Sequence, residues 1–148
     1  MIGETCSNML ATHSMRYPAE PFSPADEVFR FAQLMRFSNR TGERGYVLDG
    51  WQYGFETLSF VIIEARADDG PPLHTHPYEA AHIVLSGTMA YVLGDQRFTV
   101  AGPYVVRIPA SVPHTFLNLG DQPICLVAAF ATKRLSWNVL GSNPLITM

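Results

Sequence analysis

Short runs of β-branched and aromatic residues fill the chain from Gly45 onward, and Gly, Pro, Asp or Asn separate them. The runs recur at intervals of roughly 8 to 12 residues, which is typical of antiparallel strands joined by short turns. The segment LGDQRF reads as a hairpin turn between two such strands. The pattern therefore predicts an all-β antiparallel sandwich or barrel of about 90 residues. The runs cover residues 56–66, 80–87, 88–95, 96–100, 104–109, 114–120 and 124–130.

Both ends of the chain follow a different pattern. The segment RYPAEPFSP is typical of an extended arm, and Met15 offers an alternative start that would make the first fourteen residues dispensable. The run 23–37 is ambiguous, because SPAD resembles a helix start whereas the alternation FRF suits an edge strand. We therefore expect an N-terminal arm (1–40) with one strand or short helix and a barrel (41–131). A C-terminal tail (132–148) would pack on the barrel or on a partner subunit.

Composition bounds the class of protein. Of the 148 residues, 47% are hydrophobic and 16% are charged, which fits one globular domain with a substantial core. The net charge is −3 and Lys and Arg are scattered, so nucleic acid is not expected as a partner. No apolar stretch reaches the roughly 18 to 20 residues that a membrane span needs. Cys6 and Cys125 are far apart, and the N-terminus lacks a basic region followed by a long apolar run, so a cytoplasmic protein is expected.

The segment HTHPYEAAHIVLSG, residues 74–87, concentrates the candidate chemistry. Residues i and i+2 of a strand share a face, so His74 and His76 can point together into a barrel. Gly and two prolines just before the pair fix the chain where it enters the strand. About forty residues later, His114 follows a Pro-rich turn. Three neutral imidazoles from two strands could bind one side of a metal ion and leave other positions open for water or substrate.

These residues resemble the two motifs of a small single-domain cupin. The first motif, G-x5-H-x-H-x3,4-E-x6-G, is similar to residues 70–87, and the second, G-x5-P-x-G-x2-H-x3-N, is similar to residues 102–118. The resemblance covers about residues 45–131 and implies an antiparallel double-stranded β-helix, or jelly-roll barrel, and a homodimer. By this resemblance His74, His76 and His114 match the metal-binding histidines. Gly87, Pro109 and Asn118 match structural positions of the motifs.

The chain also departs from these motifs. Counting back from Gly87, the glutamate ligand of the family falls on Ala80, and Glu79 lies next to it. Ser111 replaces the inner glycine of the second motif, and Gly70 lies two residues closer to the first histidine than the pattern asks. The fold expectation is unaffected by these changes. The fourth ligand is the part of the site that they leave open.

Three alternatives stay open for that ligand. A β-bulge could turn Glu79 inward, since bulges gather near active sites. His82 shares a face with position 80, so it could be a fourth ligand or stand behind the first three; it could equally be a hydrogen-bonded core residue. The third alternative is three histidines and water. Several aromatic residues are candidates for the barrel interior: Trp51, Tyr53, Phe55, Phe60, Tyr91, Phe98 and Phe116.

The resemblance implies a function in coarse terms. Three-histidine cupin sites without the glutamate occur in non-haem iron dioxygenases that act on diketones, thiols or hydroxylated aromatics. The leading hypothesis is an enzyme with one divalent transition metal (Fe, Zn, Mn or Ni) that acts on a small apolar oxygen-bearing substrate, most simply an Fe(II) dioxygenase. The alternative is a Zn-type polyketide cyclase or isomerase in which His82 or Glu79 moves the proton. The second alternative is a cupin that binds a small ligand without catalysis.

Overall fold

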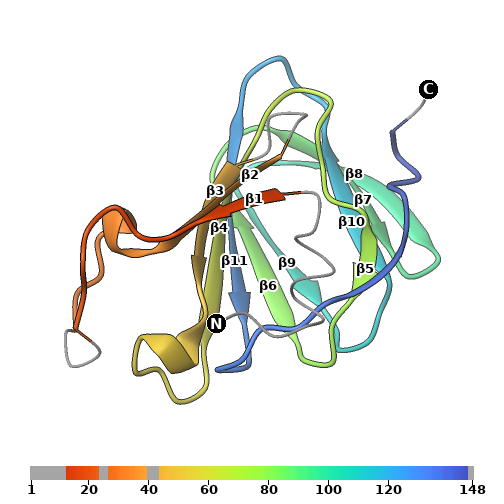
Figure 1. Ribbon diagram of the computed structural model, residues 1–148. Coiled ribbons are helices and arrows are strands. Elements are labelled where there is room, and N and C mark those ends of the chain that lie inside the picture. The colour runs from red at the N-terminus through yellow and green to blue at the C-terminus, as the bar shows by residue number, and fades with distance from the viewer. Residues whose placement is uncertain (1–12, 24–26, 40–43, 147–148) are drawn as a thin grey trace.

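The computed structural model describes residues 13–23, 27–39 and 44–146, and it contains two antiparallel sheets that face each other as a barrel (Figure 1). The strand order is β1-β2-β3-β4-β11-β6-β9 in the seven-stranded sheet and β12-β5-β10-β7-β8 in the five-stranded sheet. The predicted all-β jelly-roll class is confirmed. The seven-stranded sheet contains β1 (His13–Arg16), β2 (Met35–Asn39), β3 (Arg44–Leu48), β4 (Ser59–Ala65), β6 (Ala80–Val84), β9 (Tyr104–Ile108) and β11 (Ile124–Phe130). The five-stranded sheet contains β5 (Leu73–Thr75), β7 (Thr88–Leu93), β8 (Gln96–Ala101), β10 (His114–Asn118) and β12 (Asn138–Gly141).

The core lies between the two sheets, where alternate side chains of each strand point inward. In β6, for example, Ala80, His82 and Val84 are buried, whereas the side chain of Ile83 is exposed. Tyr91 and Phe116 are buried in this core and Phe98 packs against it, as expected for these three aromatic residues. The principal buried apolar side chains are Val47, Val61, Met89, Tyr91, Ile108, Phe116, Leu126, Phe130 and Trp137.

Three of the other aromatic residues lie outside the barrel interior. Tyr53 is buried in a second cluster with Leu34 and Leu48, and Phe55 and Phe60 pack against that cluster. The cluster lies where the N-terminal segment crosses the seven-stranded sheet. Residues of the arm and of the sheet together form this second, smaller core. Trp51 belongs to neither cluster: its side chain is 37% exposed, and the Arg134 guanidinium lies 4.4 Å from its ring centroid.

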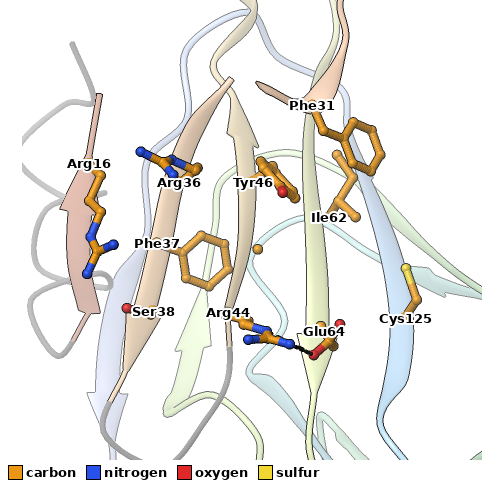
Figure 2. Close-up of a pocket in the computed structure, with 11 residues that line it drawn as sticks. Arg16, Phe31, Arg36, Phe37, Ser38, Arg44, Tyr46, Ile62, Glu64 and Cys125 are labelled. Carbon is orange, nitrogen blue, oxygen red and sulfur yellow. Dashed lines mark hydrogen bonds and ion pairs between the residues drawn. The ribbon is translucent and has the colours of Figure 1, made fainter. Parts of the chain in front are cut away.

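The N-terminal arm contributes more structure than one strand or one short helix. The ambiguous run contains a 3-10 helix, η2 (Phe31–Gln33), and β2 begins after Leu34, whereas Phe29 and Arg30 belong to neither element. The strand β1 pairs with β2, and β2 pairs with β3, so the arm widens the seven-stranded sheet. Figure 2 shows side chains of these strands in neighbouring positions on the sheet. Residues 1–12, including Cys6, and the proposed helix start at 24–26 lie outside the described residues.

The C-terminal tail packs on the barrel through β12, which pairs with β5. A second 3-10 helix, η3 (Gly50–Gln52), follows β3 and hydrogen-bonds to the start of the tail through Trp51 N–H and the Lys133 carbonyl, 2.7 Å apart. Gly87 occupies the turn between β6 and β7 with φ of 103°, and a Cβ there would lie 2.5 Å from the Ile124 side chain, so this turn needs glycine. Within the described residues, no helix has the length and apolar character to cross a membrane.

Candidate metal centre

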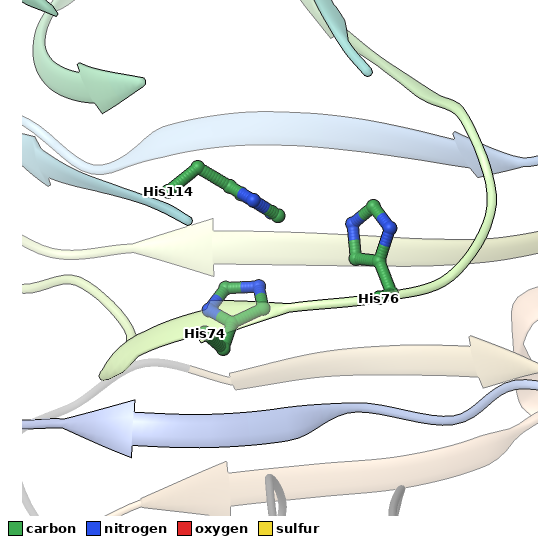
Figure 3. Close-up of side chains that lie close together, drawn as sticks. All are labelled: His74, His76 and His114. Atoms are coloured by element: carbon green, nitrogen blue, oxygen red, sulfur yellow. The ribbon is translucent and has the colours of Figure 1, made fainter. Parts of the chain in front are cut away.

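Three histidines from two neighbouring strands meet inside the barrel (Figure 3). His74 is the middle residue of β5, and it pairs in register with His114, the first residue of β10. His76 follows β5 and lies on the same side of the chain as His74. All three side chains are buried, and one ring nitrogen from each lies within 4.8 Å of the other two. The structure therefore brings together the three histidines that the sequence nominated as ligands.

The backbone fixes the orientation of each imidazole. The Nδ1 atoms of His74, His76 and His114 lie 2.7, 2.8 and 2.8 Å from the carbonyl oxygens of Pro72, Tyr78 and Val112. A carbonyl oxygen only accepts hydrogen bonds, so each Nδ1 carries the proton and each Nε2 keeps a free lone pair. The Nε2 atoms of His76 and His114 are buried and have no hydrogen-bond partner among the described residues. Buried acceptors held in this way suit a metal ion.

Electrostatics keep these ligands neutral. Burial is the first cause that lowers the pKa of His74 well below its usual value, and repulsion from His114 adds to it. Burial also lowers the pKa of His76, and it lowers the pKa of His114 to about 4. Neutral imidazole is the form that binds a metal, so the three side chains are ready to do so at neutral pH without losing a proton.

The turn that precedes His114 keeps a glycine-type conformation although the sequence departs from the cupin motif there. Ser111, which replaces the inner glycine, has φ of 63°, in the left-handed region that glycine favours. Its N–H donates a hydrogen bond of 2.7 Å to the His76 carbonyl, and the N–H of Val112 reaches the Pro109 carbonyl at 3.4 Å. The turn therefore ties the strand of His114 to the segment of His76 through the backbone N–H of residue 111.

Asn118 has the structural role that the motif suggested. Its Nδ2 donates to the carbonyl oxygens of Ala65 and Gln122, at 2.9 and 2.8 Å, and its Oδ1 accepts from the N–H of Gly120 at 2.8 Å. The side chain is fully buried. It closes the turn at the far end of β10 and attaches that turn to β4.

His82 points into the barrel but stands apart from the three ligands. Its ring centroid lies 6.2 Å from that of His114, and its Nδ1 lies 3.5 Å from the Tyr91 hydroxyl. It is absent from the group whose ring nitrogens lie within 4.8 Å of one another. Burial, with repulsion from His114 and His76, lowers its pKa to about 3. His82 is therefore a neutral side chain beside the candidate metal centre, and this structure does not place it as a fourth ligand.

The structure shows no bulge in β6 that would turn Glu79 inward, and Glu79 does not join the three histidines. Its side chain is 57% exposed and lies 3.5 Å from Arg107 in a surface ion pair. The next residue, Ala80, is only 3% exposed and faces the interior. Strand alternation thus places the small apolar side chain inside and the carboxylate outside. No carboxylate joins the three histidines among the described residues.

Aromatic side chains that sequence reasoning missed support the centre. The ring of Tyr78 stacks on His76 with centroids 5.0 Å apart and an 8° angle, and Phe130 meets His76 edge-on at 5.3 Å. The Tyr78 hydroxyl donates to the Ser136 carbonyl at 2.7 Å and accepts from the Ser136 N–H at 2.8 Å. Tyr78 lies two residues after His76 within the motif, and this position could have identified it from the sequence as a neighbour of the ligands. Phe130 and Ser136 are distant in sequence and gave none.

Comparisons with known proteins agree with this geometry. Residues 59–130 match the model of the cupin domain family. The match covers just under half of the chain, and this segment is similar to a cupin domain. The matched segment includes all three candidate ligands, so the cupin resemblance inferred from the motifs is confirmed. No curated protein matches the chain.

Solved structures share the cupin fold at low sequence identity. Oxalate decarboxylase of Lactobacillus farciminis, in a formate complex, superposes with a TM-score of 0.70 and 21% identity, covering 76% of this chain and 35% of that one. Oxalate decarboxylase of Bacillus subtilis at pH 4.6 gives 0.62 and 20%, covering 67% and 28%. Another structure of the Bacillus subtilis enzyme, described by its Mn(II) centres, gives 0.63 and 19%, with the same coverage. The chain thus spans about a third of these proteins, and the likeness concerns the fold.

Proposed function

We propose that this cupin is a metal-dependent enzyme that oxidises a small, apolar, oxygen-bearing substrate, most simply an Fe(II) dioxygenase. The observation that carries the proposal is the cluster of three buried imidazoles without a carboxylate, in which the Nε2 atoms of His76 and His114 have no partner among the described residues. His74, His76 and His114 would hold the metal. When bound, a divalent transition metal would offer coordination positions beyond the three imidazoles and, as Fe(II), supply redox chemistry toward dioxygen.

The interior around the histidines suits an apolar substrate. The ring of Phe116 meets His82 edge-on at 5.6 Å, and Phe130 and Tyr78 cover His76. These aromatic walls would contact the carbon skeleton of a substrate rather than a charged group. A diketone or a hydroxylated aromatic ring fits such surroundings, because it combines an apolar body with paired oxygen atoms.

His82 would bind and orient the substrate rather than remove a proton from it. A side chain with a pKa of about 3 is a weak base near neutral pH, whereas efficient general bases have a pKa near the working pH. The neutral ring can instead donate or accept one hydrogen bond to a substrate oxygen. Tyr91 lies 3.5 Å from its Nδ1, and the Tyr91 and Tyr104 hydroxyls are 2.9 Å apart, so a chain of hydrogen bonds restrains the ring.

This arrangement favours the oxygenase over the cyclase. The cyclase needs a residue that moves a proton beside the metal, and Glu79 faces solvent while His82 has a strongly lowered pKa. For the metal we propose only the class, a divalent transition ion. Fe(II) is the simplest for the oxygenase, and the Mn(II) centres named for the Bacillus subtilis enzyme make Mn(II) a second candidate.

The first experiment measures metal content in protein purified without chelator. We expect about one divalent ion per chain. His114→Ala should lose it, because two imidazoles remain. His82→Gln is the matched control: it removes a buried histidine outside the cluster and should keep the metal. Protein without stoichiometric metal, or equal retention in both variants, would contradict the proposed centre.

The second experiment measures oxygen uptake by the Fe(II)-loaded protein with a panel of diketones and catechols. We expect substrate-dependent uptake that is absent from His114→Ala and reduced in His82→Gln at unchanged metal content. Anaerobic incubation is the control. Conversion of a substrate without oxygen uptake by the zinc-loaded protein would instead support the cyclase. Binding without any conversion would support the non-catalytic alternative.

A further inference from the structure

A second candidate site lies on the outward face of the seven-stranded sheet, away from the histidines (Figure 2). A cavity of about 610 Å³ spreads there over β2, β3, β4 and β11. Cross-strand register places Arg36, Tyr46 and Ile62 in one row on this face. The neighbouring residues Val47 and Val61 face the core instead and are buried. The sheet itself therefore separates this cavity from the candidate metal centre.

One end of the cavity carries positive charge that the described residues do not neutralise. Arg16 and Arg36 are direct cross-strand partners in the pairing of β1 with β2. Like charges opposite each other destabilise a sheet unless something compensates them. The third arginine, Arg44, forms an ion pair of 2.8 Å with Glu64. Glu64 is the only acidic residue among the described residues that line the cavity, and no ion pair between described residues includes Arg16 or Arg36.

Most hydrogen-bond donors of these two guanidinium groups have no partner among the described residues. Within the described ranges, Arg36 makes one long contact, from Nη2 to the Tyr17 carbonyl at 3.4 Å, and its buried Nε has no partner there. A guanidinium carries five N–H donors and binds a carboxylate through two parallel hydrogen bonds. Figure 2 shows Arg16 and Arg36 on adjacent strands, with the Arg36 side chain directed toward β1. An anion between them would relieve the repulsion and use the free donors.

The other end of the cavity is aromatic and apolar. Phe31 packs on Tyr46 with ring centroids 4.9 Å apart, although its side chain is half exposed. Ile62 is the cross-strand neighbour of Tyr46 and continues this surface. A small inorganic anion would leave the surface uncovered, whereas a ligand with a flat apolar body would cover it. A cationic end beside an aromatic end favours a ligand that has both a negative charge and a flat apolar body.

We propose that this cavity binds an aromatic monocarboxylate, with the carboxylate between Arg16 and Arg36 and the ring against Phe31 and Tyr46. The volume suits one small ring compound, since ligand sites commonly measure about 300 to 1,000 Å³. The site is independent of the metal centre, because its residues lie on the opposite face of the sheet. It could therefore be occupied whether or not the proposed oxygenase activity is correct.

Benzoate is the probe for this proposal, and calorimetric titration of the full-length, metal-loaded protein is the measurement. We expect saturable binding of one benzoate per chain. Arg16→Gln and Arg36→Gln should each weaken it by at least roughly 10-fold, because each removes a charge-assisted hydrogen-bond pair. Arg97→Gln is the matched control: Arg97 is an exposed arginine on β8 of the other sheet, and its loss changes the net charge equally. Binding to Arg97→Gln should be unchanged.

Three further probes define the ligand class. Benzamide has the ring without the charge, and inorganic phosphate has the charge without the ring, so both should bind at least roughly 10-fold more weakly than benzoate. Phe31→Ala should weaken benzoate while leaving phosphate unchanged. Phosphate binding as tight as that of benzoate would reduce the site to a simple anion site and overturn the aromatic assignment.

Other outcomes would overturn the location. Unchanged benzoate affinity in both arginine variants would place the ligand elsewhere. Loss of benzoate binding in His114→Ala, with the arginines intact, would place it at the metal centre. If benzoate does not bind and Arg36→Gln changes the sedimentation of the protein, a second copy of the chain covers this face instead. Arg36→Lys keeps the charge and most of the stem, so it tests the fork geometry should Arg36→Gln fold poorly.

Discussion

Ser111 has a left-handed backbone conformation, and its N–H forms a hydrogen bond that connects two segments of the candidate metal centre. Its φ is 63°, and its N–H reaches the His76 carbonyl at 2.7 Å. The side chain is exposed and is given no hydrogen bond or ring contact by the structure. The turn therefore imposes this conformation, and the serine side chain forms no contact with the described residues that stabilises it. A left-handed L-residue costs roughly 1 to 2 kcal/mol.

Ser111→Gly should accordingly stabilise the protein. Glycine removes the left-handed cost but adds freedom to the unfolded chain, so we expect a net gain of a few tenths to about 1 kcal/mol. Urea unfolding of the metal-free protein measures this as a higher midpoint at an unchanged slope. Ser86→Gly is the control, since Ser86 is exposed but has no positive φ, and it should be destabilising. Equal destabilisation by both substitutions would show that position 111 is not strained.

Near the first motif, counting along the sequence predicts which side chains face the barrel interior. Counting back from Gly87 placed Ala80 inward where the family has its glutamate, and the structure agrees. Period-two alternation then required Glu79 to face outward. The strand follows this alternation and has no bulge that would turn Glu79 inward. The inward direction of His82 followed from the same alternation. Its distance from His114 did not, because that distance depends on how two strands from different sheets pack.

At the scale of elements, the tail holds the segment that bears two ligands. The strand β12 pairs with β5, where Val139 lies opposite His74. Just before β12, the backbone of Ser136 forms two hydrogen bonds with the Tyr78 hydroxyl, and the Tyr78 ring stacks on His76. Tail and ligand segment thus support each other on both sides of the histidine pair.

Tyr78→Phe should weaken this support while keeping the ring. It leaves the C=O and N–H of Ser136 without their partner, and we expect a loss of about 1 to 3 kcal/mol in the free energy of unfolding. Metal affinity should fall by no more than roughly 10-fold, because the Tyr78 carbonyl still accepts from His76. Chemical unfolding and competitive metal titration measure the two effects. Tyr17→Phe, at an exposed tyrosine in the arm, should change neither value; an unchanged stability of Tyr78→Phe would refute the role of the tail.

The elements also divide into those that the sequence predicts and those that it does not. Strands between residues 56 and 130 were predictable because alternation, turn residues and the two motifs agree there. The strands β1 and β12 were not, because each is short and pairs with a strand distant in sequence, β1 with β2 and β12 with β5; for β2 the sequence left helix and strand open. Tyr53 and Phe55 could not be assigned to the second cluster for the same reason: the arm that covers them joins the sheet through nonlocal contacts.

At the scale of the whole molecule, the barrel keeps four uncharged histidines buried in a largely apolar core. Burial lowers the pKa of His74 and His76, and with neighbouring histidines it lowers the pKa of His82 to about 3 and of His114 to about 4. These side chains regain an ordinary pKa near 6.5 when the chain unfolds. Folding and protonation are therefore linked through this group of residues.

Stability of the metal-free protein should fall as the pH falls below about 6.5. Above that pH the histidines are neutral in both states, so they add no pH dependence. Below it the unfolded chain takes up protons that the folded barrel cannot, until the pH reaches the folded-state pKa of about 4 for His114 and about 3 for His82. Each histidine contributes at most about 1.4 kcal/mol per pH unit within this window.

Urea unfolding at pH 7.5, 6.5, 5.5 and 4.5 measures this dependence, with His82→Gln as the matched comparison. Carboxylates titrate alike in both proteins, so the difference between the two slopes isolates one histidine. We expect the variant to lose stability more slowly, by up to about 1.4 kcal/mol per pH unit between pH 6 and 4.5. Equal slopes would mean that His82 takes up a proton inside the barrel as readily as in the unfolded chain. That result would also remove the reason for treating His82 as a neutral, orienting side chain.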